Sequence, residues 1–164
     1  MLPANWLVET SGIPFGLMGD MLYLCGNQWR GMLYGMSSRL GWSTENIICD
    51  PKPLWKVWDE FGIADAKMHG YWDKSNPVTT SDSSVLATSY IKKDSILIAI
   101  AGWNKKNVDV YIHIDAAKLG WQHGEVMLAP AIDNYRPQRT FNINNPLTVE
   151  PGKGWLLIIK KKKQ

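Results

Sequence analysis

Acidic side chains in the N-terminal part of the sequence are candidates for chemistry, because two carboxylates can act as a general acid and a general base. Asp59 and Glu60 lie in a predicted helix and are expected to face solvent, whereas Asp50 is expected to cap that helix. Glu9 and Asp20 remain as tentative catalytic residues. No convincing pair is found among them, so we do not expect this chain alone to catalyse a reaction that needs paired carboxylates.

Arg39 and Trp42 are the better candidates for binding a ligand. A guanidinium donates a planar set of hydrogen bonds to a carboxylate or hydroxyl group, and a tryptophan three residues later can stack beneath a ring. The alternative is an exposed arginine and a packed tryptophan. The sequence holds nine tryptophans, an excess that favours a carbohydrate-related protein, because an indole stacks on the apolar face of a sugar. Trp103 and Trp121 could form such a surface, although core packing is the default use of each.

The remaining histidine, cysteine, glycine and serine residues do not have the spacing of a metal site, a phosphate-binding loop or a nucleophile motif. His69, His113 and His123 have no partner residues at metal-ligand spacing, and there is no Cys-x-x-Cys motif. No glycine-rich phosphate loop and no nucleophile elbow occurs. We therefore expect no metal and no cofactor. Cys25 and Cys49 could pair, but buried free thiols are the favoured interpretation.

The charge is concentrated at one end of the chain. The net charge is +3, from 18 basic and 15 acidic residues, and four of the basic residues are the run Lys160 to Lys163. Without that run the balance is 14 against 15, or −1, so the body has no basic field for nucleic acid. No apolar stretch is long enough to span a membrane. The N-terminus has no signal peptide, which by itself predicts a cytoplasmic protein if Met1 is the true start.

From residue 67 onward, β-periodicity dominates. The apolar run Ser95 to Trp103 predicts a central strand buried on both faces, and the alternation from Val108 to Ile114 predicts a half-buried strand with His113 toward solvent. The polar residues 104–107 predict a hairpin between these two strands. Short strands separated by turns predict an antiparallel β-sandwich. The other predicted strands are 85–92, 126–129, 140–143, 147–149 and 155–159.

The first 66 residues have a different pattern and predict a separate unit, so the expected domains are 1–66 and 67–164. Gly16 to Leu24 predicts a short helix. Trp29 to Met36 is apolar and glycine-punctuated, and periodicity alone leaves a buried strand or a helical turn open. Pro53 to Phe61 predicts a helix with Leu54, Trp55, Trp58 and Phe61 on one face, which ends at Gly62.

Several stretches together resemble a known architecture. They are Trp6-Leu-Val-Glu-Thr-Ser-Gly-Ile-Pro-Phe-Gly-Leu-Met-Gly-Asp20, Trp29-Arg-Gly-Met-Leu-Tyr-Gly-Met36, Leu54-Trp-Lys-Val-Trp-Asp-Glu-Phe-Gly-Ile63, Gly70-Tyr-Trp72 and Pro151-Gly-Lys-Gly-Trp-Leu-Leu-Ile158. They resemble the C-terminal part of a bacterial glycoside hydrolase-like protein of the family 123-like group. The C-terminal domain is also similar to those of α-galactosidase-type enzymes.

The resemblance implies a mainly β fold, in which an antiparallel β-sandwich follows an α/β fragment resembling the last units of a TIM barrel. Residues 29–36 would be the eighth barrel strand. Ser38, Arg39 and Trp42 would lie near the active-site face as substrate-binding residues, because barrel enzymes place their sites at the carboxyl ends of strands. The implied partners are a carbohydrate and a barrel domain upstream, with a periplasmic or extracellular bacterial location.

Two functions of different classes follow. The first is the C-terminal fragment of a glycoside hydrolase-like enzyme, in which the sandwich is an accessory, stabilising domain that is not catalytic alone. The alternative is a stand-alone carbohydrate-binding β-sandwich module. The fragment hypothesis predicts that the N-terminal part cannot close a core by itself, so that Trp6, Phe15, Leu17 or Met32 would form an exposed apolar patch.

Overall fold

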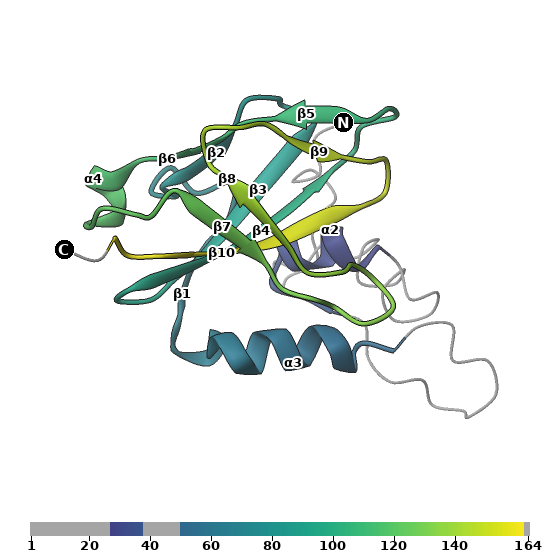
Figure 1. Cartoon of the computed structure of the whole chain (residues 1–164), viewed down its shortest axis with the longest axis horizontal. Helices are drawn as coiled ribbons and strands as arrows, with labels where there is room; N and C mark the ends of the chain where they lie inside the picture. The colour runs from purple at the N-terminus through teal and green to yellow at the C-terminus, as the bar shows by residue number, and fades with distance from the viewer. Residues whose placement is uncertain (1–26, 38–49, 163–164) are drawn as a thin grey trace, which may run out of the picture.

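A six-stranded antiparallel sheet is the centre of the structure. The computed structural model of the chain describes residues 27–37 and 50–162 (Figure 1). Neighbouring strands of the sheet follow the order β1-β3-β4-β10-β7-β8. Their bounds are β1 (Lys67–His69), β3 (Val85–Ile91), β4 (Ser95–Gly102), β10 (Gly154–Lys160), β7 (Val126–Ala129) and β8 (Arg139–Asn142).

Two short two-stranded sheets form the second layer of the sandwich. One pairs β2 (Val78–Thr80) with β6 (Ile112–Ile114), and the other pairs β5 (Val108–Val110) with β9 (Leu147–Val149). Their inward side chains share one hydrophobic cluster with alternate residues of the large sheet, among them Ile96, Ile98 and Ile100 of β4. The four-residue helix α4 (Ala116–Leu119) adds Leu119 to this cluster. The predicted antiparallel β-sandwich is thus confirmed.

Two helices cover the opposite face of the large sheet (Figure 1). Helix α2 (Gln28–Leu33) and helix α3 (Lys52–Phe61) pack on the other set of alternate residues, which includes Leu97, Ala99 and Leu156. Strand β4 is therefore buried on both faces, as its continuous apolar run predicts. The fold is mainly β, with helices on one side of the sheet and short strands on the other.

Helix α3 begins and ends close to the predicted residues. The predicted cap at Asp50 is one residue early, because Pro51 occupies the N-cap position and makes no side-chain cap bond. The Asp50 carboxylate accepts a hydrogen bond from the Lys52 backbone N–H at 3.0 Å, and Gly62 ends the helix with a φ of +73°. The buried face consists of Leu54, Val57 and Phe61, whereas Trp55 is only half-buried. A 3₁₀ turn (Ile63–Asp65) then leads into β1.

The six predicted strands at 85–92, 95–103, 126–129, 140–143, 147–149 and 155–159 correspond to β3, β4, β7, β8, β9 and β10. The alternation of 108–114 is also present, with Val110 and Ile112 buried and His113 exposed, although the chain forms two strands, β5 and β6, instead of one. Because each strand pattern is local, sequence periodicity predicts it. The pairing of the strands depends on residues far apart in the sequence, so periodicity does not predict it.

The predicted hairpin between 95–103 and 108–114 is wrong. Strand β4 pairs with β3 and β10, while β5 pairs with β9 in the second layer. The buried Asn104 accounts for the change of layer: its Nδ2 donates to the Lys106 carbonyl oxygen at 2.7 Å and to that of Val149 at 2.9 Å. These bonds direct the chain away from β4 toward β9.

The expectation that residues 29–36 form a barrel strand is also wrong, because residues 28–33 are helical. The Asn27 side chain caps the helix by accepting from the Arg30 backbone N–H at 3.1 Å. Met32 is buried, with 1% of its surface exposed, so it contributes to a core and not to an exposed patch. Trp6, Phe15 and Leu17, and the helix predicted at 16–24, lie outside the described residues.

Candidate functional site

The predicted catalytic and binding residues lie outside the part of the chain that the structure describes. These residues are Glu9, Asp20, Ser38, Arg39 and Trp42, and each stays a prediction. Their described neighbour Ser37 accepts a 2.7 Å hydrogen bond from the Trp55 indole N–H, so the segment that leads toward Ser38 contacts helix α3.

Helix α2 is joined to the sheet by three long-range hydrogen bonds. The Tyr90 hydroxyl donates to the Met32 carbonyl oxygen at 2.7 Å, and the Thr88 hydroxyl donates to that of Leu33 at 2.7 Å. Both donors come from β3 and both bonds are buried. The third bond runs from Arg30 Nε to the Gly102 carbonyl oxygen at 3.0 Å. The carbonyl groups at the helix end therefore find their partners on the sheet.

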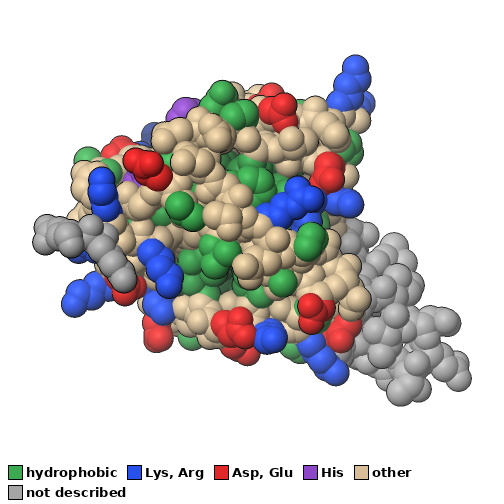
Figure 2. Space-filling model, in the orientation of Figure 1, with side chains coloured by type: hydrophobic (Ala, Val, Ile, Leu, Met, Phe, Trp, Pro, Cys, Tyr) green, Lys and Arg blue, Asp and Glu red, His purple; other side chains and the backbone are tan. Residues whose placement is uncertain are grey.

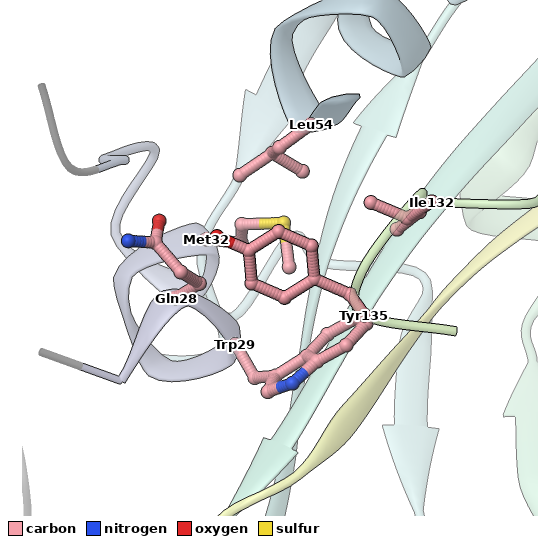
Figure 3. Close-up of a pocket in the computed structure, with 6 residues that line it drawn as sticks. All are labelled: Gln28, Trp29, Met32, Leu54, Ile132 and Tyr135. Atoms are coloured by element: carbon pink, nitrogen blue, oxygen red, sulfur yellow. The ribbon is translucent and has the colours of Figure 1, made fainter. Parts of the chain in front are cut away.

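A small apolar crevice lies where the two helices meet the loop before β8 (Figure 3). Two of the lining rings, Trp29 and Tyr135, meet edge to face, with centroids 6.4 Å apart. The lining offers few polar groups, so the crevice suits packing better than catalysis. Its lining residues are Gln28, Trp29, Met32, Leu54, Ile132 and Tyr135.

Residues 70–76, which we call the aromatic loop, carry the most exposed Phe, Tyr or Trp side chain in the described part of the chain. Trp72 is 52% exposed. Its ring stacks on Tyr34 with centroids 5.6 Å apart and planes inclined by 20°, and Tyr71 meets it edge-on at 4.9 Å. The hydroxyl groups of Tyr34 and Tyr71 share a 2.9 Å hydrogen bond. Burial raises the pKa of both tyrosines above the ordinary value, so the cluster is uncharged near neutral pH.

Side chains of β3 and of the loop itself hold the aromatic loop in place. The buried Asn76 donates from Nδ2 to the Ala87 carbonyl oxygen at 2.9 Å, and its Oδ1 accepts from the Ser89 hydroxyl at 2.8 Å. The Tyr71 backbone N–H donates to Thr88 Oγ1 at 3.2 Å. The exposed Trp72 side chain is thus carried by a loop whose backbone is held by hydrogen bonds to β3.

His69, Asp73 and Ser75 form a polar cluster beside the loop. His69 Nδ1 lies 3.0 Å from Asp73 Oδ2 and 2.7 Å from Ser75 Oγ. A serine nucleophile and its orienting carboxylate need different ring nitrogens of the histidine, whereas here both use Nδ1, so this is not a catalytic triad. The Ser75 backbone N–H and hydroxyl, helped by His69, hold the pKa of Asp73 below its usual range. The cluster closes the turn that carries Trp72.

A second cluster, of Arg136, Glu150 and Trp155, lies near the end of the large sheet. The Arg136 guanidinium lies 4.0 Å from the centroid of the Trp155 ring and forms an ion pair with Glu150. The Arg136 hydrogen bond holds the pKa of Glu150 below its ordinary value. Both acidic side chains in these clusters therefore favour the charged form, which is the opposite of what a general acid requires.

The described residues contain no group of three or more metal-ligating side chains and no helix long enough to cross a membrane. Cys25 and Cys49 lie outside them. Trp103 and Trp121 do not form a joint surface, because they pack against hydrophobic clusters on opposite faces of the large sheet. On the face shown in Figure 2, acidic and basic side chains are interspersed, in keeping with the near-neutral body of the sequence.

Two family models match the chain. The model described as glycoside hydrolase 123, C-terminal domain, matches residues 50–160, which include every strand of the sandwich. The chain belongs to the glycoside hydrolase 123 family. The model described as glycoside hydrolase 123, TIM-barrel domain, matches residues 1–41, a segment that contains helix α2. No curated protein and no solved structure matches the chain.

Membership of the glycoside hydrolase 123 family confirms the resemblance found in the sequence. The match to the barrel domain also confirms a barrel-derived segment at the N-terminal side of the sandwich. Sequence reasoning did not select Trp72 as a site residue, although Gly70-Tyr-Trp72 was among the familiar stretches. The available signal was a pair of adjacent aromatic residues followed by the polar run Asp73-Lys-Ser75.

Proposed function

We propose that the β-sandwich of this chain is the accessory, stabilising domain of a glycoside hydrolase that acts on a carbohydrate. The catalytic carboxylates belong to the barrel, most of which lies upstream of this chain, and the sandwich is not catalytic alone. A whole barrel takes roughly 250 residues, and the segment matched here is 1–41. The division of the chain into 1–66 and 67–164 remains part of this proposal.

The observation that carries the proposal is the contact between helix α2 and the sheet. The helix lies in the segment that matches the barrel domain, whereas the sheet matches the C-terminal domain. Trp29, Met32 and Leu33 are each at most 7% exposed and share a cluster with Leu97 and Leu156. A barrel segment that shares a core with the sandwich is stabilised by it.

The described carboxylates support the non-catalytic role. Asp50, Asp82 and Asp115 accept hydrogen bonds from backbone N–H groups in turns and at helix starts. The carboxylate pKa shifts that are resolved, at Asp73, Asp82 and Glu150, are all downward. A glycosidase acid needs a raised pKa and a second carboxylate across the scissile bond.

Two variants test the coupling of α2 to the sheet. Tyr90→Phe removes the hydrogen bond to the Met32 carbonyl group, and Thr88→Val removes the bond to the Leu33 carbonyl group, each with a nearly unchanged side-chain volume. Thr88→Val also removes the acceptor of the Tyr71 backbone N–H, so Tyr90→Phe is the cleaner test. We expect each to lower the free energy of unfolding by about 1–2 kcal/mol. Hydrogen exchange should accelerate more in a peptide covering 28–36 than in β5 and β9. The control Thr79→Val, on the exposed face of β2, should leave both unchanged.

Two results would contradict the proposal. If residues 28–36 of the unmodified chain exchange their amide hydrogens at the rate of an unfolded peptide, the sandwich does not stabilise the helix. If the chain releases nitrophenol from a panel of nitrophenyl glycosides, and replacement of a carboxylate within 50–162 abolishes that release, the sandwich is itself catalytic.

A further inference from the structure

We propose that Trp72 is a stacking surface for the apolar face of a pyranose ring, so that the C-terminal domain holds a carbohydrate-binding subsite of its own. The proposal takes its ligand class from the proposed function and adds a site outside the barrel. The evidence lies in the exposure of the ring, the rigidity of its support and the chemistry of its neighbours.

Trp72 is exposed in spite of its contacts with neighbouring rings. Tyr34 stacks along one face of the ring and Tyr71 contacts it edge-on, yet 52% of the residue remains accessible. Leaving an indole in water forgoes the stabilisation that burial would give. A pyranose presents several C–H groups on one face and hydroxyl groups around its rim, so a single supported ring can hold it while water reaches the rest.

The support of the ring is preorganised. Gly70 is buried beneath it, and a Cβ at that position would overlap the six-membered ring of Trp72. The position therefore requires glycine if the indole is to keep its orientation. The Asn76 and Tyr71 hydrogen bonds to β3 fix both ends of the turn. A rigid aromatic side chain loses little entropy on binding, which favours recognition of a small ligand.

The neighbours of Trp72 favour a sugar over a protein partner. The next three residues are polar: the Asp73 side chain is 38% exposed, and Lys74 and Ser75 are exposed. The Lys74 ammonium group can donate to hydroxyl groups at the rim of a sugar, and the Asp73 carboxylate can accept from them. A protein interface needs about 800 Å² on each side with an apolar centre, whereas in this loop Trp72 is the one exposed large hydrophobic side chain.

Saturation-transfer NMR on the whole chain tests the proposal. The probes are methyl β-D-glucopyranoside, methyl β-D-galactopyranoside and methyl α-D-mannopyranoside, with the open-chain polyol sorbitol as a ligand control. We expect transfer to the ring C–H protons of at least one glycoside and none to sorbitol. Trp72→Ala should weaken binding about tenfold or more, and Trp72→Phe should weaken it less.

Two further variants separate stacking from general effects. Gly70→Ala keeps the indole but displaces it, so it should weaken binding as well. Tyr111→Ala removes another exposed ring, 44% accessible, from a different part of the sandwich and should leave binding unchanged. Circular dichroism and thermal unfolding establish that each variant is folded.

The proposal is overturned if no glycoside receives saturation from the folded chain, or if Trp72→Ala and Tyr111→Ala bind equally well. Either result leaves the accessory role intact, because that role is tested by Tyr90→Phe, whose hydrogen bond to Met32 does not involve the aromatic loop. Conversely, the Tyr90→Phe variant could leave hydrogen exchange in α2 unchanged while sugar binding still depends on Trp72. That result would contradict the accessory role and support the subsite.

Discussion

At the residue scale, Gly154 is a position where helix α2 and strand β4 both lie close to β10. A Cβ there would overlap the Ile100 carbonyl oxygen and lie 3.0 Å from the Trp29 Cβ. Gly154 also pairs with Ala101 at the start of β10. Backbone from β4 and a side chain from α2 therefore meet at a position where no side chain fits.

We expect Gly154→Ala to destabilise the chain by about 1–3 kcal/mol, the usual cost of overpacking a core. Urea unfolding measures the change. The matched control is Gly124→Ala, whose added Cβ would lie at an ordinary 3.4 Å from the Lys160 carbonyl oxygen; its effect should stay within about 0.5 kcal/mol. Equal effects of the two substitutions would contradict the close packing of Ile100 and Trp29 around Gly154.

At the element scale, the connection from β4 to β5 decides which sheet the chain enters next. A four-residue polar turn between two apolar runs is a hairpin signal, and the sequence alone offers no reason to reject it. The hydrogen bond from Asn104 to Val149 spans 45 positions and becomes visible only in three dimensions. Strand positions could therefore be predicted from local periodicity, but this pairing could not.

We expect Asn104→Ala to lower the free energy of unfolding by about 1–3 kcal/mol, because it leaves the buried Val149 carbonyl group without its side-chain donor. Hydrogen exchange should also accelerate in β5 and β9 before it does so in β3. Asn107→Ala, an exposed residue of the same turn, serves as the control and should be neutral. An Asn104→Ala chain as stable as the control would mean that the turn, and not the buried amide, directs the crossing.

The candidate site illustrates the same limit. Tryptophan is packed in most proteins, and apart from the adjacent Tyr71 and the polar run that follows, nothing local distinguishes the Trp72 indole from the buried Trp155. Its exposure depends on Gly70, on Asn76 and on Tyr34 from a distant segment. The tentative carboxylates Glu9 and Asp20 were selected by residue type alone, and they lie outside the described part of the chain.

At the scale of the whole molecule, buried tyrosines make the free energy of unfolding depend on pH in the alkaline range. Burial raises the pKa of Tyr34, Tyr71, Tyr90 and Tyr135 above the ordinary value. The folded chain thus holds these protons more tightly than the unfolded chain, in which tyrosine has a pKa of about 10. Their contribution to stability is complete below pH ~10 and is lost as the pH rises toward the folded-state values.

We expect the urea midpoint to fall steeply between about pH 10 and pH 11 and to change little between about pH 8 and pH 9. The slope should be shallower in Tyr71→Phe, because that variant has one fewer proton to lose. A midpoint that stays constant up to pH 11 would contradict the burial of these hydroxyl groups.

The strand order has a consequence for how the protein is made. Strand β10 lies between β4 and β7, and the Asn27 side chain at the other end of the described chain donates to the Gly152 carbonyl oxygen. During synthesis on the ribosome, β4 and β7 therefore have no common neighbour until residues 154–160 emerge. Until then the nascent chain carries two open strand edges, which are sites of aggregation. Helix α2 can form its hydrogen bonds to β3 and β4 earlier, but its hydrophobic cluster is complete only once Leu156 of β10 has been synthesised.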